Sequence, residues 1–130
     1  MIVLDASALL EALLPTGTAL ALQARLFAPG ETWHAPHVLD AEFAQGIRRH
    51  SMAGGISREQ AEAAFADYAN LFIHRHLHGP LLRRVWALRN NLTAYDGIYV
   101  ALAETLNATL LTRDKRLANA AGHTARVELV

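Results

Sequence analysis

Short apolar runs alternate along the chain with longer segments in which apolar side chains recur every three or four residues. The runs at 2–4 and 109–112 are rich in Ile, Val and Leu, as in strands buried on both faces. Weaker runs at 32–34, 71–76 and 126–130 predict further strands. Because the segments between them have helical spacing, the pattern predicts an α/β sandwich around a mainly parallel sheet, with the first strand at its centre.

Turn and cap residues divide the helical segments. Pro15 to Gly17 form a predicted break, and Ser57 with Gln60 forms a capping box at the start of a helix whose inner face should include Phe65. Pro36 is expected to start the helix that runs to about His50. The predicted helices cover residues 9–14, 18–27, 36–50, 57–71, 79–88, 93–106 and a short stretch after 114.

Composition restricts the class of protein. Apolar residues make up 52% of the 130 residues, which is typical of a folded chain, and we expect one domain over 1–130. The formal net charge is zero, so any polyanionic partner must be held locally. Cysteine is absent, which excludes disulfides, thiolate metal sites and cysteine nucleophiles. The first apolar run is too short for a membrane span or a signal peptide, so a cytoplasmic protein is expected.

Two acids follow apolar strands. Asp5 comes directly after the run at 2–4, and Asp114 comes two residues after the run at 109–112. The carboxyl ends of parallel strands share one edge of the sheet, and ligands bind at that edge. Each aspartate could instead simply cap the helix that follows it.

Two further acids lie on helices that are expected to be buried. Glu42 borders the apolar stripe of its helix, where an ionised carboxylate needs a cation, a proton or water. Asp96 lies in the first turn of a helix that is apolar nearly all round, so it should enter an interior cleft. Taken singly, Glu42 could be solvated and Asp96 could be a helix cap.

Together the four acids point to a metal site. Two unit charges about 6 Å apart repel by roughly 3 kcal/mol at an effective dielectric constant of 20, so four converging carboxylates would need a cation. Oxygen ligands without cysteine favour a hard ion, Mg²⁺ or Mn²⁺. Such ions bind phosphates and lower the pKa of a bound water for hydrolysis.

The order of these residues resembles a PIN domain. The matching segments are Asp5–Leu9, Pro36 with Glu42 six residues later, Tyr95–Ala103 and Leu111–Asp114. More narrowly, the sequence is similar to the VapC group of toxin ribonucleases from bacterial and archaeal toxin–antitoxin pairs. The resemblance spans almost the whole chain.

The resemblance implies a fold, an activity and partners. The fold is a PIN-like three-layer sandwich, in which a five-stranded, mainly parallel sheet has helices on both faces. The activity is that of a Mg²⁺- or Mn²⁺-dependent endoribonuclease, in which an activated water attacks the RNA phosphate. The partners are a cognate antitoxin, the RNA substrate and a second copy in a homodimer. The implied catalytic residues are Asp5, Glu42, Asp96 and Asp114, with Asp5, Asp96 and Asp114 as metal ligands and Ser7 and Thr112 as polar neighbours.

The same resemblance implies where the antitoxin binds. It would wrap an apolar groove near the first two helices and could place a basic side chain at the acidic site. Leu10, Leu13 and Leu14 are candidates for this groove, although ordinary core packing would also explain them. Many relatives carry a further acid or amide after the last aspartate, and Asn119 is the candidate here.

Basic residues near the acids are candidates for RNA binding. Arg113, Lys115 and Arg116 flank Asp114, and Arg49 lies about two turns after Glu42 on the same helix face. A solvated surface is the alternative for each of them. A histidine zinc site is conceivable, but we expect surface or hydrogen-bonded residues, because closed zinc sites need four convergent ligands. The histidines concerned are His34, His37, His74, His76 and His78.

Two other functions remain open from the sequence. A phosphoreceiver-like signalling domain has a similar length and alternation, but it would want an acid pair after the first strand, where this chain has Asp5 followed by Ala6 and Ser7. A PIN-like module that binds RNA or a partner without turnover is the second alternative.

Overall fold

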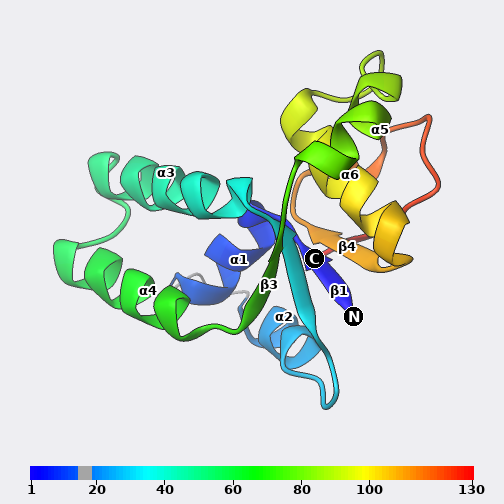
Figure 1. Ribbon diagram of the computed structural model, residues 1–130. Helices are drawn as coiled ribbons and strands as arrows, with labels where there is room; N and C mark the ends of the chain where they lie inside the picture. Colours follow the sequence, from blue (N-terminus) through cyan, green and yellow to red (C-terminus); the bar gives the residue numbers. More distant parts are fainter. Residues whose placement is uncertain (15–18) are drawn as a thin grey trace.

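A computed structural model describes residues 1–14 and 19–130 of the chain (Figure 1). The predicted break at Pro15 to Gly17 and the predicted helix start at Thr18 lie outside these residues. Within them, a five-stranded, all-parallel sheet is covered by helices. The strands are β1 (Ile2–Leu4), β2 (Trp33–Pro36), β3 (Ile73–His76), β4 (Thr109–Thr112) and β5 (Arg126–Leu129). The helices are α1 (Ala6–Leu13), α2 (Ala19–Leu26), α3 (Val38–Met52), α4 (Arg58–Asn70), α5 (Leu82–Ala87), α6 (Ala94–Leu106) and α7 (Lys115–Ala118), with a 3₁₀ turn at Gly79–Leu81.

The strand order, β3-β2-β1-β4-β5, places β1 at the centre as predicted. Ile2 pairs with Trp33 of β2 on one side and with Thr109 of β4 on the other. The chain first builds outward to β3 and then returns to the other side of β1, so the crossover direction switches between β1 and β4. Ligands bind at such a switch point. Phosphoreceiver domains have the order β2-β1-β3-β4-β5, so this sheet does not support that alternative.

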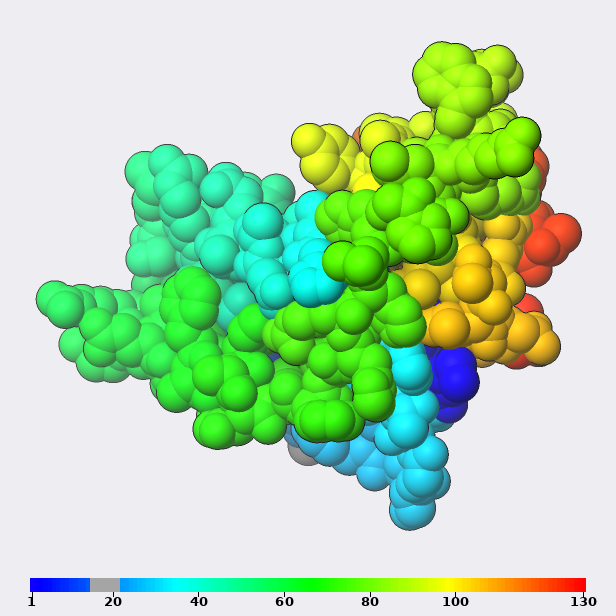
Figure 2. All heavy atoms as spheres, in the orientation of Figure 1, coloured from blue at the N-terminus to red at the C-terminus, as the bar shows by residue number. Residues whose placement is uncertain are grey.

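Helices cover both faces of the sheet, which confirms the three-layer sandwich. Side chains alternate along β1: Ile2 and Leu4 join one apolar cluster with α1 to α4, and Val3 joins a second cluster with α5 to α7. Helices α3 and α4 extend to one side of the sheet as an arm (Figures 1 and 2). Across the described ranges, no helix has the length and apolar character needed to cross a membrane.

Four predicted boundaries are wrong, and the start of the first helix is one of them, because α1 begins at Ala6 and not at residue 9. Pro36 ends β2 rather than starting a helix, and α3 begins at Val38. A proline is tolerated at the end of a strand because its missing N–H interrupts little of the hydrogen-bond ladder. Strand β3 begins only at Ile73, because the N–H of Leu71 bonds to a carbonyl of the last turn of α4. The segment after Gly79 begins with a 3₁₀ turn before α5.

Helix α4 shows one confirmed and one wrong prediction. The Ser57–Gln60 capping box forms at its start, with both reciprocal hydrogen bonds. Phe65, however, is 44% exposed rather than inward-facing. Helix α4 belongs to the projecting arm, so it buries a narrower stripe than predicted. Ala64 is buried, Tyr68 stacks on Phe43 at 4.1 Å between ring centroids, and Phe65 contacts Phe43 only edge-on.

Glu104 ties three segments together on the α6 side. Its carboxylate accepts bonds from Nε and Nη2 of Arg84, at 2.7 and 2.9 Å, and from the N–H of Thr124 at 2.8 Å. The Arg84 hydrogen bond, opposed by burial, lowers the pKa of Glu104 from 4.5 to about 2. The folded-state pKa lies below the ordinary value, so this stabilisation is complete above about pH 4.5 and is lost as the pH falls toward 2.

We therefore predict that Glu104→Gln lowers the free energy of unfolding by roughly 1–3 kcal/mol at neutral pH, because charge-assisted bonds are lost. The difference from wild type should shrink as the pH is lowered toward about 3, as measured by urea unfolding at each pH. Glu62→Gln is the matched control, because Glu62 pairs with Arg58 on an exposed helix face and should change stability by less than ~0.5 kcal/mol. A pH-independent difference for Glu104→Gln would contradict the role of its charge.

Candidate active site

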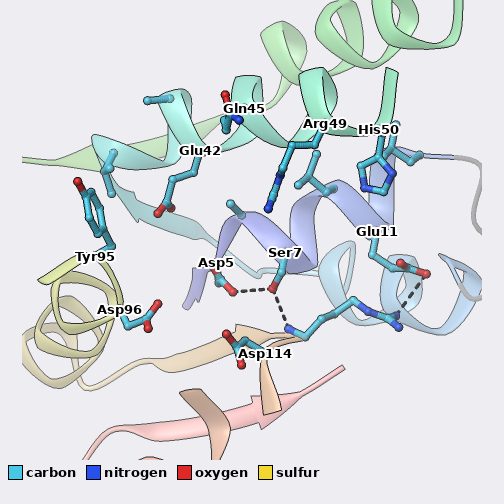
Figure 3. A pocket seen from close by; sticks show the side chains of 16 residues that line it. Asp5, Ser7, Glu11, Glu42, Gln45, Arg49, His50, Tyr95, Asp96 and Asp114 are labelled. Carbon is cyan, nitrogen blue, oxygen red and sulfur yellow. Dashed lines mark hydrogen bonds and ion pairs between the residues drawn. The ribbon is translucent and has the colours of Figure 1, made fainter. Parts of the chain in front are cut away.

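A pocket of about 580 Å³ lies at the carboxyl edge of the sheet, beside the switch point between β1 and β4. The four predicted acids all line it, and they come from four different elements (Figure 3). Asp5 follows β1, Glu42 lies on α3, Asp96 lies in the first turn of α6, and Asp114 follows β4. Residues separated by up to 109 positions in the chain therefore share one hollow.

A hydroxyl network holds Asp5 at the end of the central strand. Ser7 Oγ and Thr112 Oγ1 both donate to Asp5 Oδ2, at 2.5 and 2.6 Å. Each hydroxyl in turn accepts a backbone N–H, from Arg113 for Ser7 and from Asp114 for Thr112. Each hydroxyl has a single proton, and the N–H bond that it accepts occupies one of its lone pairs. The protons of Ser7 and Thr112 are therefore both oriented toward Asp5. The other oxygen, Oδ1, takes no part in this network. Asp5 does not cap α1 with its side chain, so the capping alternative is not supported.

Glu42 reaches the pocket from α3 and is anchored from α6. The hydroxyl of Tyr99 donates to Glu42 Oε2 at 2.6 Å. Burial raises the pKa of Glu42, and the charges of Asp5 and Asp96 raise it further, while the Tyr99 bond acts in the opposite direction. Glu42 is therefore a partly buried member of the acidic group and not a solvated surface residue.

The pKa values of Asp96 and Asp114 are shifted in opposite directions, although both residues line the same pocket. Burial, followed by the charges of Asp114 and Asp5, raises the pKa of Asp96 against the effect of Thr93. Burial also acts to raise the pKa of Asp114, but the N–H groups of Arg116 and Leu117 and the Arg116 guanidinium outweigh it, and the pKa is lowered. Asp114 thus caps α7 and lines the pocket at the same time, so its two predicted roles do not exclude each other.

The donor set fits a hydrated hard cation. Among the described residues, no three side chains of the His, Asp or Glu types come close enough to enclose an ion by themselves. Mg²⁺ does not require such a cage, because it keeps several waters and binds through one or two carboxylates. The pocket offers carboxylate oxygens, the oriented Asp5 among them, and room for water between them. The pocket is therefore more compatible with a hydrated ion such as Mg²⁺ or Mn²⁺ than with a closed zinc site.

The predicted basic residues divide into two groups. Arg49 and Arg113 line the pocket, and Arg113 pairs with Glu11 of α1 at 3.3 Å. Arg116 lies beside Asp114, with its Nη2 3.4 Å from a carboxylate oxygen and its side chain 92% exposed. Lys115 is exposed on α7 and does not belong to the pocket lining. The structure therefore places Arg49 and Arg113 in the pocket wall, and leaves Lys115 and Arg116 beside Asp114 but outside the pocket lining.

Leu10 and Leu14 line the pocket, and both are buried in the core. Leu13 is partly buried and packs against the same apolar cluster. Core packing thus accounts for these leucines, and two of them also form apolar pocket wall. Asn119 directly follows α7, donates to the carbonyl of Lys115 at 2.6 Å and does not line the pocket.

Three of the five candidate histidines, His34, His76 and His78, form side-chain hydrogen bonds, in line with the expectation of surface or hydrogen-bonded residues. His34 Nδ1 lies 3.0 Å from His76 Nε2, and the His34 ring stacks on His74. His78 accepts the N–H of Val38 at the start of α3. Burial, reinforced by neighbouring histidines, lowers the pKa values of His34 and His76, so both are expected to be neutral at pH 7.

Sequence reasoning missed several residues of this site, and Tyr95, which lines the pocket, is one of them. Tyr99 was seen only as part of a matching segment, although its position three residues after Asp96 places both on one helix face. Gln45 and His50 follow Glu42 on α3, and Glu11 follows Ser7 by one turn on α1. Helical spacing from Glu42 and from Ser7 was the signal that could have found Gln45, His50 and Glu11, whereas the contact of Tyr99 with Glu42 depends on the facing helix and left no signal in the sequence.

Comparison with known proteins gives the family. A family model described as PIN domain matches residues 2–123. Ribonuclease VapC1 of Mycobacterium tuberculosis is 43% identical over 129 residues, which cover 98% of this chain and 96% of the relative. Ribonuclease VapC12 of the same organism is 42% identical over 130 residues, covering 100% and 99%.

Solved structures share the fold at low sequence identity. VapBC2 from Rickettsia felis, bound to a DNA fragment from its promoter, has a TM-score of 0.71 at 18% identity, with 100% of this chain and 99% of that chain covered. FitAcB from Neisseria gonorrhoeae has a TM-score of 0.67 at 19% identity, with 90% of each chain covered. With nearly full-length relatives above 40% identity and a matching family model, the chain belongs to the PIN-domain family and, within it, to the VapC group.

Proposed function

We propose that this protein is a Mg²⁺- or Mn²⁺-dependent endoribonuclease and the toxin of a toxin–antitoxin pair. The observation that carries the proposal is the convergence of Asp5, Glu42, Asp96 and Asp114 on one pocket at the switch point of the sheet. The names of the similar VapC proteins, which are ribonucleases, indicate the substrate class.

The residues of the pocket have separable roles in this proposal. Asp5, Asp96 and Asp114 would hold the divalent ion, with Ser7 and Thr112 orienting Asp5. The ion would supply a water of lowered pKa and positive charge next to the phosphate. Glu42 keeps one carboxylate oxygen for a water of the pocket. Arg49 and Arg113, which line the same pocket, would bind RNA phosphates next to the one that is cleaved.

The proposal includes the partners. A cognate antitoxin would cover the part of the pocket lined by Leu10 and Leu14 and place a basic side chain among the acids. The solved neighbours VapBC2 and FitAcB support a cognate antitoxin as partner. We expect the toxin to act as a homodimer in the cytoplasm.

The test is cleavage of an internally and 5′-labelled RNA by the purified protein with Mg²⁺. We expect internal cuts, and ends that carry a linear phosphate, because water and not the 2′-hydroxyl is the nucleophile. Asp96→Asn, which removes one charge without changing side-chain size, should give no cuts. RNA binding without cleavage by the wild type would instead favour a PIN-like module that lacks turnover, and 2′,3′-cyclic phosphate ends would contradict the proposed chemistry.

A further inference from the structure

Tyr99 is a core residue with one polar atom directed at the active site. Its side chain is 1% exposed and packs in the apolar cluster of α5 and α6. Its hydroxyl lies 2.6 Å from Glu42 Oε2. One helical turn earlier, the same helix delivers Asp96 to the pocket. Helix α6 therefore places one acid of the site directly and holds a second acid on α3.

The direction of this hydrogen bond is fixed. Burial, together with the neighbouring carboxylate of Glu42, strongly raises the pKa of Tyr99, so the phenol keeps its proton. An ionised Glu42 can only accept. The bond occupies Oε2 and restricts the rotation of the carboxylate, which leaves Oε1 as the oxygen available to the pocket.

The acceptor of the Tyr99 hydroxyl indicates a role beyond packing in the core. A buried tyrosine hydroxyl needs a partner, but a neutral carbonyl or amide would satisfy it. Here the partner is a partly buried carboxylate whose charge is opposed by Asp5 and Asp96. Holding an acid in that position costs free energy, and a purely structural contact would not require it.

We infer that Tyr99 is a positioning residue: its hydroxyl fixes the carboxylate of Glu42 so that Oε1 faces the divalent ion and its waters. The inference rests on the proposed function, because it assigns a purpose to Glu42 in the same pocket. It predicts that Tyr99 acts only through Glu42.

Tyr99→Phe removes the hydroxyl and keeps the ring. We expect a 10- to 100-fold loss in kcat and a weaker affinity for Mn²⁺, measured by calorimetry without RNA, with little change in the KM for RNA. Tyr68→Phe is the matched control, since Tyr68 also donates to a carboxylate, but its acceptor Asp40, unlike Glu42, does not line the pocket. It should change kcat and Mn²⁺ affinity less than about two-fold.

A double-mutant cycle separates positioning from general destabilisation. In a Glu42→Ala background, Tyr99→Phe should have almost no further effect on kcat or Mn²⁺ affinity. Unchanged kinetics and Mn²⁺ binding in Tyr99→Phe, or an equal loss with and without Glu42, would overturn the inference. A wild type that neither cleaves RNA nor binds Mn²⁺ would overturn the proposed function first.

A second measurement uses the unaltered protein, in case Tyr99→Phe does not fold. With ¹³C-labelled tyrosine, the Cζ resonance of Tyr99 should shift when Mg²⁺ is added, because its hydrogen-bond acceptor then faces a cation. The Cζ resonance of Tyr68 should not shift. A Tyr99 resonance that Mg²⁺ leaves unchanged would contradict the inference.

Discussion

Asp5→Asn is expected to reduce RNA cleavage by at least about 10³-fold while leaving the fold intact. A bound ion stabilises the transition state of phosphate hydrolysis by several kcal/mol, and each 1.36 kcal/mol corresponds to a factor of ten. Asp5 lies at the end of the central strand, where two hydroxyls orient it. Asparagine has the same shape, and its oxygen can still accept these bonds, but the charge that attracts the cation is gone.

The stability of the Asp5→Asn variant should not fall with its activity. The negative charge of Asp5 contributes to the raised pKa values of Glu42 and Asp96, so its removal relieves repulsion. Without divalent ions, the free energy of unfolding should be equal to that of wild type or slightly higher. Asp67→Asn, on the exposed side of α4, is the control and should change neither property. Wild-type cleavage by Asp5→Asn would refute the role of this residue.

Removing divalent ions from the wild-type protein should reduce RNA cleavage as strongly as Asp5→Asn does. With excess chelator, RNA cleavage should stop, since four carboxylates without a cation repel one another and also repel the RNA phosphate. Excess Mg²⁺ or Mn²⁺ should restore cleavage and also stabilise the protein, by about 2.7 kcal/mol at a free-ion concentration 100 times the Kd. The Asp5→Asn variant should gain much less stability from the ion. Full activity in excess chelator would exclude the mechanism.

The general architecture could be predicted because its signals are local. The apolar run of β1 has no polar face, so it had to be buried on both sides and central. The capping box at Ser57 fixes the start of α4 through bonds three residues apart. The helix start predicted at Pro36 was wrong because a proline is compatible with both the start of a helix and the end of a strand. Only the pairing with β3 distinguishes the two.

The site was predictable in part for a similar reason. Asp5 and Asp114 follow strands, and the carboxyl ends of parallel strands must share an edge. The contact between Glu42 and Tyr99 depends instead on how α3 and α6 approach each other across that edge, 57 residues apart in sequence. Periodicity places each residue on a face of its own helix but says nothing about the facing helix, so Tyr99 was missed.

The central claim is that these four acids form the binding site of one or more divalent ions. Anomalous diffraction from crystals grown with Mn²⁺ tests it most directly. We predict an anomalous peak inside the pocket, bonded directly or through water to the carboxylates of Asp5, Asp96 and Asp114, with Glu42 facing it. Saturating Mn²⁺ with no peak in the pocket, or with a peak only elsewhere on the protein, would contradict the account.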